Sequence, residues 1–128
     1  MNQVKNILIV EDEQLTRELL EILLSSRGYR VTQATDGYQG LELAAKGDFD
    51  AIITDLEMPR INGLEMIRIL REERGYTKPI IIVSGYDDMA HRSPLAQLHL
   101  LKSLNIELLF SYLRQILGDS EKHSFFTD

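Results

Sequence analysis

Three strand-sized runs of apolar residues limit the folds that this chain can adopt. They lie at Ile7 to Val10, Ala51 to Thr54 and Ile80 to Val83. A run in which apolar and polar residues do not alternate is typical of a strand that is covered on both faces. Segments with helical spacing of apolar residues lie between the runs, and this alternation on short connections predicts right-handed βαβ units. The three runs should therefore be the central strands of a parallel sheet with helices on both faces.

Weaker patterns complete this fold. Shorter or less apolar strands are expected at 29–34 and 98–101, and helices at about 14–27, 37–46, 63–74 and 106–117. Pro94 interrupts the only candidate helix between the last two strands, so this fourth helix should be short or irregular. For the same reason the stretch 86–97 should have low local stability. The predicted fold class is α/β, a doubly wound, five-stranded parallel sheet.

Composition excludes several classes of protein. A chain of 128 residues with a formal charge of -6 is one globular domain, and it lacks the clustered Lys and Arg of a nucleic-acid surface. Its acidic balance also argues against adsorption to a membrane. The absence of cysteine fits a reducing compartment, and the N-terminus lacks the apolar stretch of a secretion signal. We therefore expect a cytoplasmic protein, a monomer or weak dimer, with neither nucleic acid nor membrane as a partner.

Polar residues stand where the strands are expected to end. Glu11 and Asp12 follow the first run, Asp55 follows Thr54, and Ser84 and Lys102 close the last two strands. The carboxyl ends of parallel strands share the edge at which α/β proteins bind ligands, so these side chains should converge. Clustered carboxylates repel one another unless a cation neutralises them, and oxygen ligands without His or Cys select Mg²⁺ over zinc. A carboxylate beside Mg²⁺, an ammonium group and a hydroxyl is suited to phosphoryl transfer.

These segments resemble the receiver domain of bacterial two-component response regulators over about Lys5 to Leu117. The resemblance rests on the run that ends in Glu11-Asp12 and on the spacing Asp55-Leu56-Glu57-Met58-Pro59-x-x-x-Gly63, followed in order by Ser84 and Lys102. It implies a flavodoxin-like receiver fold and a stand-alone signalling protein similar to the chemotaxis regulators.

The resemblance also implies roles around one phosphoacceptor. Asp55 would accept the phosphoryl group from the phosphohistidine of a sensor histidine kinase or phosphotransfer protein. Asp12, Asp55 and the backbone carbonyl of Glu57 would ligate Mg²⁺, and Glu11 would contact the metal through water. Mg²⁺ is the only cofactor implied. The domain would catalyse only its own Mg-dependent phosphorylation and dephosphorylation, and would not otherwise be an enzyme.

Two further site residues and two departures complete the comparison with the family. Lys102 and the Ser84 hydroxyl would contact phosphoryl oxygens, and the inward movement of the Ser84 loop would be the switch. Ser103 stands where the family usually has proline, which puts the usual cis peptide after Lys102 in question, because a non-prolyl cis bond costs about 3 kcal/mol. His99 takes the place of an aromatic residue that changes rotamer on activation, and is either a packed histidine or the rotating group.

Three functions compete at this point. The first is a stand-alone receiver, with a receiver domain at 1–118 and a polar tail at 119–128, that acts on a downstream protein partner. The second is a degenerate receiver that binds proteins constitutively, which Ser103 and the irregular fourth helix favour. The third is a Mg-dependent phosphohydrolase with Asp55 as nucleophile. Glu57 in place of an aspartate, and the absence of a cap segment, argue against the third.

Overall fold

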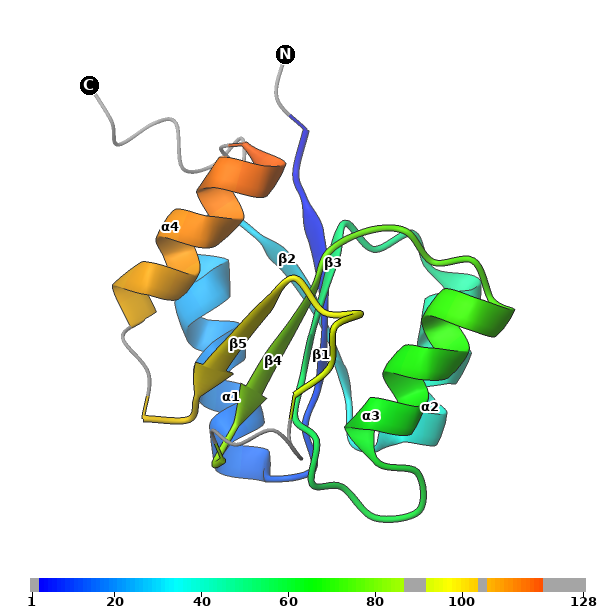
Figure 1. Cartoon of the computed structure of the whole chain (residues 1–128). Coiled ribbons are helices and arrows are strands. Elements are labelled where there is room, and N and C mark those ends of the chain that lie inside the picture. Colours follow the sequence, from blue (N-terminus) through cyan, green and yellow to red (C-terminus); the bar gives the residue numbers. More distant parts are fainter. Residues whose placement is uncertain (1–2, 87–91, 104–105, 119–128) are drawn as a thin grey trace, which may run out of the picture.

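The computed structural model describes residues 3–86, 92–103 and 106–118 and contains one five-stranded parallel sheet in the order β2-β1-β3-β4-β5 (Figure 1). The strands are β1 (Asn6–Val10), β2 (Arg30–Ala34), β3 (Ala51–Thr54), β4 (Ile80–Ser84) and β5 (Leu98–Leu101). The helices are α1 (Gln14–Ser26), α2 (Gly37–Lys46), α3 (Gly63–Arg68) with its π-helical continuation η1 (Ile69–Glu73), and α4 (Ile106–Leu117).

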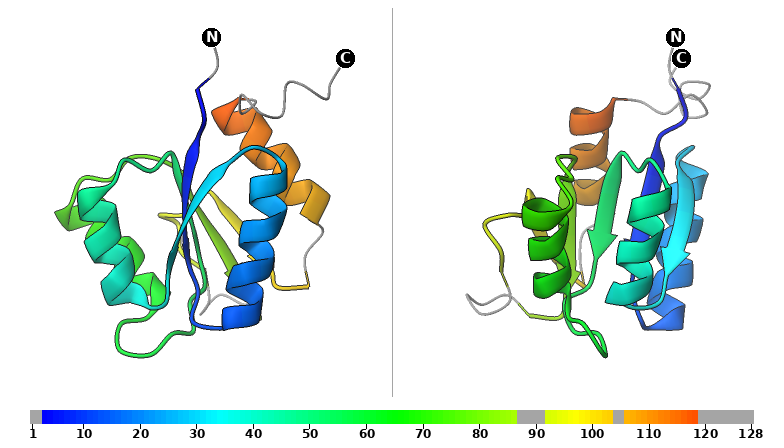
Figure 2. Two further views of the ribbon diagram at one scale, coloured as in Figure 1. Left: turned by 180° about the vertical axis from the view of Figure 1, so that it is seen from behind. Right: turned by 90° about the vertical axis from the view of Figure 1, so that its right-hand side faces the viewer.

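The predicted fold class is confirmed. Helices α1 and α4 cover one face of the sheet, and α2 and α3 cover the other (Figures 1 and 2). Side chains of β1 alternate between the two faces, so that Ile7 and Ile9 pack on the α1 side while Leu8 and Val10 pack on the α2 side. The three most apolar runs lie in the three central strands, and every residue of the runs is buried.

Local signals in the sequence set the helix ends. The Asp36 side chain accepts a hydrogen bond from Gln39 N at 2.8 Å at the start of α2, and Asn62 accepts one from Glu65 N at 2.9 Å at the start of α3. Gly28 adopts a positive φ of 91° just beyond the end of α1, as expected for a glycine after a helix. Within the described residues, no helix is long and apolar enough to cross a membrane.

The connection between β4 and β5 contains no helix in its described part. Residues 92–97 form a turn in which Leu95 N donates to Ser93 Oγ at 3.1 Å and Ala96 N donates to Ser93 O at 3.2 Å. Leu95 and Ala96 pack against the core on the α2 side. This agrees with the interruption expected at Pro94. Residues 87–91 of the segment expected to be irregular lie outside the described residues.

Arg71 on η1 anchors the described half of this connection. Its Nε donates to Leu95 O at 3.0 Å, and one terminal nitrogen donates to Tyr76 O and Lys78 O at 2.7 Å each. The other terminal nitrogen donates at 2.8 Å to Gln97 Oε1, which also accepts from Ile80 N at 2.8 Å. One guanidinium group thus joins the end of η1 to the starts of β4 and β5. Residues 92–97 should therefore be better ordered than their sequence pattern alone suggests.

We expect Arg71→Met to lower the free energy of unfolding by about 2–4 kcal/mol, because each of the four acceptors loses a hydrogen bond with a net value near 1 kcal/mol. Denaturant unfolding followed by circular dichroism measures the change. Arg74→Met is the matched control, since Arg74 lies on the exposed surface close by and should change stability by less than about 0.5 kcal/mol. Equal losses in the two variants would contradict an anchoring role for Arg71.

Candidate functional site

The sheet places two carboxylates side by side at the carboxyl edge of the central strands. Glu11 N donates to Ala34 O at 3.0 Å, and Asp55 N donates to Val10 O at 3.0 Å. These bonds continue the pairing of the strands by one residue. The backbone at Glu11 and at Asp55 is therefore fixed by the sheet itself, independently of side-chain contacts. Glu11 is 2% exposed and Asp55 is 4% exposed. The two carboxylates are therefore withdrawn from most of the solvent.

Lys102 brings a positive charge between these carboxylates. Its backbone N donates to Ser84 O at 2.8 Å, which fixes the residue directly after β5. Its Nζ lies 3.2 Å from Asp55 Oδ2 and 3.2 Å from Glu11 Oε1. Because buried carboxylates need a compensating charge, the ammonium group stabilises this arrangement. The neighbouring carboxylates outweigh the opposing effect of burial and raise the pKa of Lys102 above its ordinary value, so the amine stays charged.

A third carboxylate completes an acidic cluster. Oxygens of Glu11, Asp12 and Asp55 lie within 4.8 Å of one another, and Asp12 is exposed to solvent. Carboxylate oxygens at this spacing are the donor set that suits a hard divalent cation such as Mg²⁺, with water at the remaining positions. The exposed Asp12 leaves one side of the cluster open. The residues present therefore fit the cation that their sequence pattern predicts.

The turn after β3 orients the Asp55 carboxylate. Leu56 N donates to Asp55 Oδ1 at 2.7 Å, and Glu57 N lies 3.4 Å from the same oxygen. This leaves Oδ2 facing Lys102. At the far end of the turn, Gly63 N donates to Leu56 O at 3.0 Å. A Cβ at residue 63 would lie 2.2 Å from Asp55 O, so only glycine fits there and the spacing from Asp55 to Gly63 has a steric cause.

Ser84 lies next to this cluster without joining it. Its side chain is buried, and its hydroxyl accepts a hydrogen bond from Tyr86 N at 3.1 Å. Ser84 is paired in register with Leu101, one residue before Lys102. His99, in the middle of β5, pairs in register with Ile82. The peptide bond between Lys102 and Ser103 is trans, so the lysine reaches Asp55 without the cis bond that was in question.

Arg17 is a contributor that the sequence pattern did not single out. One guanidinium nitrogen donates to Glu11 O at 2.8 Å, and Nε donates to Gln33 Oε1 at 2.8 Å. The side chain thus holds the segment that links β1 to α1, which carries Glu11 and Asp12. An arginine in the first turns of a helix just after an acidic pair was the available signal, but it also suits an ordinary solvated helix.

Burial dominates the electrostatics of Glu11. Desolvation raises the pKa of its carboxyl group from 4.5 to about 7, a hydrogen bond from Glu13 N opposes the rise, and the Asp55 charge adds to it. Lys102 offsets part of this effect. The charge on Glu11 therefore changes near neutral pH when no metal is bound.

This shift predicts a pH dependence of stability in the metal-free protein. Glu11 holds its proton more tightly in the folded chain, so its contribution to stability is greatest below about pH 4.5 and is lost as the pH rises to about 7. Glu11→Gln should flatten the fall over that interval, measured as the free energy of unfolding in EDTA. Glu42→Gln, at an exposed carboxylate, should leave the slope as in the wild type. Parallel profiles for wild type and Glu11→Gln would refute the shift.

Comparison with known proteins places this site in a family. A model of the response regulator receiver domain matches residues 7–114. The response regulator ArlR of Staphylococcus haemolyticus is 40% identical over an alignment of 116 residues, and the match covers 88% of this chain and 52% of that protein. The chain therefore spans about half the length of the curated relatives it matches.

Solved structures share the fold. The response regulator TrrA of Thermotoga maritima, in complex with Mg²⁺ and BeF, is 33% identical with a TM-score of 0.77 over 89% of this chain and 100% of that one. The chemotaxis response regulator CheY4 of Vibrio cholerae is 29% identical with a TM-score of 0.81 over 90% of this chain and 100% of that one. The resemblance inferred from the acidic pair and the Asp55 segment is thus confirmed, and the chain belongs to the response regulator receiver domain family of two-component systems.

Proposed function

We propose that this receiver domain is a phosphorylation-controlled switch that accepts a phosphoryl group on Asp55 from a sensor histidine kinase or phosphotransfer protein. The observation that carries the proposal is the position of the Asp55 carboxylate, which is buried within the acidic cluster and has its Oδ2 3.2 Å from the Lys102 ammonium group. In the transfer, the P–N bond of the phosphohistidine breaks, a P–O bond forms to Asp55, and the imidazole leaves and takes up a proton.

The reaction should depend on Mg²⁺. Asp12, Asp55 and the Glu57 backbone carbonyl would hold the ion, with Glu11 in contact through water, and the ion would neutralise the charge that repels an incoming phosphoryl group. TrrA, whose structure contains Mg²⁺ and BeF, supports this assignment. The Glu57 backbone lies beside Asp55, since Glu57 N is 3.4 Å from Asp55 Oδ1.

Lys102 and Ser84 would act on the phosphoryl group. The Lys102 Nζ faces Asp55 Oδ2, the side on which a phosphoryl oxygen could take over its charge-assisted hydrogen bond. The Ser84 hydroxyl accepts a hydrogen bond from Tyr86 N and would donate its own proton to a phosphoryl oxygen. That new bond would draw the segment after β4 toward the site, which is a two-state response to a local charge.

The remaining assignments are parts of the same proposal. The domain would catalyse only its own phosphorylation and dephosphorylation, act in the cytoplasm on a downstream protein partner, and comprise residues 1–118 before a tail at 119–128. The stand-alone arrangement and the exclusion of nucleic acid stay predictions, because the relatives are about twice as long. A degenerate, constitutive binding module is less well supported, because the acidic cluster and the lysine are both in place.

A row of apolar side chains on α1 suits the protein that donates the phosphoryl group. Leu15, Leu19 and Ile22 are 78%, 56% and 65% exposed and follow one stripe of the helix. The stripe starts beside the acidic pair, and a groove of about 240 Å³ continues from Leu19 to Lys102. A donor that brings its phosphohistidine to Asp55 must cover the surface next to the site, so this row is placed to bury apolar area against it.

Asp55 should be the single site of phosphorylation, and modification should need Mg²⁺. Incubation with acetyl phosphate and Mg²⁺ should add the mass of one phosphoryl group to the intact chain, while Asp55→Asn or EDTA should abolish the addition. Asp50→Asn is the control, because Asp50 lies just before β3, away from the carboxyl edge of the sheet, and should not change the result. An adduct that persists in Asp55→Asn would refute the assignment.

Leu19→Glu should slow phosphoryl transfer from a phosphorylated histidine phosphotransfer domain by about tenfold, as expected for a central apolar contact, and leave the rate with acetyl phosphate unchanged. Leu108→Glu is the matched control, since Leu108 is 50% exposed on α4. The transfer rates are measured by rapid quenching with a donor that phosphorylates the wild type. If Leu19→Glu slowed both donors equally, or neither, the α1 row would not be the docking surface.

A further inference from the structure

Arg60 has an unusual backbone conformation. Among the described residues it is the one non-glycine residue with positive φ, at 72°. Side chains disfavour this region because Cβ comes too close to the backbone. Arg60 lies in the turn between β3 and α3, the segment that begins with Asp55 and carries the Glu57 carbonyl. Such conformations persist where surrounding contacts hold them, and they gather near functional sites.

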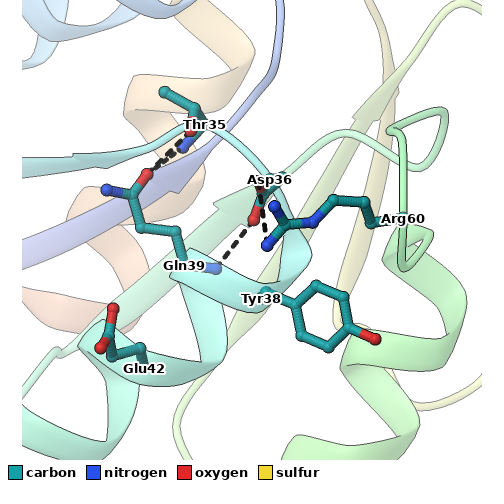
Figure 3. Close-up of a pocket in the computed structure, with 6 residues that line it drawn as sticks. All are labelled: Thr35, Asp36, Tyr38, Gln39, Glu42 and Arg60. Atoms are coloured by element: carbon teal, nitrogen blue, oxygen red, sulfur yellow. Dashed lines mark hydrogen bonds and ion pairs between the residues drawn. The ribbon is translucent and has the colours of Figure 1, made fainter.

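The contacts that hold Arg60 come from the start of α2 (Figure 3). Its guanidinium carbon lies 4.8 Å from the centroid of the Tyr38 ring, within the range of a cation–π contact. One of its terminal nitrogens lies 3.8 Å from Asp36 Oδ2. The other oxygen of Asp36 accepts from Gln39 N, so the acceptor is itself fixed as the cap of α2. These residues line an open pocket on the surface together with Thr35 and Glu42.

The same turn is in close contact with α2 at a second point, Gly37. A Cβ at Gly37 would lie 2.2 Å from Ile61 Cγ2 and 2.7 Å from Ile61 O, so the backbone of α2 and the turn are in direct contact there. Gly63 makes a comparably close approach to Asp55 O at the end of the turn. The turn is therefore supported at its end by Gly63 and on its outer side by the start of α2. Arg60 contributes the polar contacts between the turn and α2, through Asp36 and Tyr38.

We propose that Arg60 is a positioning residue for the Mg²⁺ site, which it stabilises by fixing the turn to Tyr38 and Asp36. The inference rests on the proposed function. It assigns Arg60 no contact with the ion or the phosphoryl group. The turn carries two of the groups expected to hold the ion, Asp55 and the Glu57 carbonyl, so releasing its outer side loosens their relative placement. Because the guanidinium is largely exposed, the effect should be modest.

The test is titration calorimetry of Mg²⁺ into the full chain. Arg60→Gly removes the guanidinium and also relieves the backbone, since glycine adopts positive φ freely. We expect Arg60→Gly and Tyr38→Ala each to raise the Mg²⁺ dissociation constant by about two- to fivefold, the strength of an exposed cation–π contact. Tyr38→Phe keeps the ring and should bind as the wild type does. The double variant should bind no more weakly than the weaker single variant, because both act through one contact.

A second readout separates positioning from general damage. The Mg²⁺ concentration that gives half the maximal rate of phosphorylation by acetyl phosphate should rise in Arg60→Gly, while the rate at saturating Mg²⁺ stays unchanged. Arg68→Ala removes an arginine that pairs with Glu65 on α3, and should alter neither quantity.

The possible failures are distinguishable. If wild type binds Mg²⁺ and Arg60→Gly binds it equally well, the inference falls while the proposed function survives. Additive effects in the double variant would also overturn it, since Arg60 and Tyr38 would then act separately. If wild type neither binds Mg²⁺ nor gains a phosphoryl group, the proposed function fails and this inference fails with it.

Discussion

The gathering of like charges at one edge of the sheet is the constraint on which this structure depends. Glu11 and Asp55 are almost fully buried and lie within a few ångströms of each other. Two such carboxylates are compatible with a folded chain because backbone hydrogen bonds fix their strands and Lys102 stands between them. Burial raises the pKa of Glu11, because removing its charge from water is only partly offset by Lys102. An additional cation is therefore favoured at the cluster, and the apolar core on both faces must supply the stability that these charges reduce.

The fold was predictable because its signals are local and repeat. Each central strand is a continuous apolar run and each helix has an apolar stripe, and Asp36 and Asn62, which are residue types that favour helix starts, cap α2 and α3. The convergence of Asp55, Glu11 and Lys102 was also predictable, since parallel strands end at a common edge. The sequence did not indicate which of the neighbours Glu11 and Asp12 would be buried. The structure buries the first beside Lys102 and exposes the second.

What escaped prediction depends on long side chains that join segments far apart in the sequence. Arg71 reaches residues 24 and 26 positions away, and no periodicity marks an arginine that points along a helix toward a loop. Arg17 is similar, because an arginine in a helix is usually a solvated charge. Arg60 could not be identified either, since a positive φ is expected for glycine and the turn already contains Gly63. In each case tertiary contacts decide the role of a residue whose local pattern is neutral.

The chemistry of the Arg71 contacts has a consequence for how the two ends of the sheet respond to the solution. All four of its acceptors are neutral carbonyl or amide oxygens. These acceptors therefore have no charge that salt could screen or that proton binding could remove. The carboxyl edge holds buried carboxylates, an ammonium group and a titrating Glu11, and its energy varies with pH and, where Asp12 meets solvent, with ionic strength. The amino-terminal ends of β4 and β5 therefore form a framework insensitive to the medium. The opposite ends carry the electrostatic sensitivity that a signalling site requires.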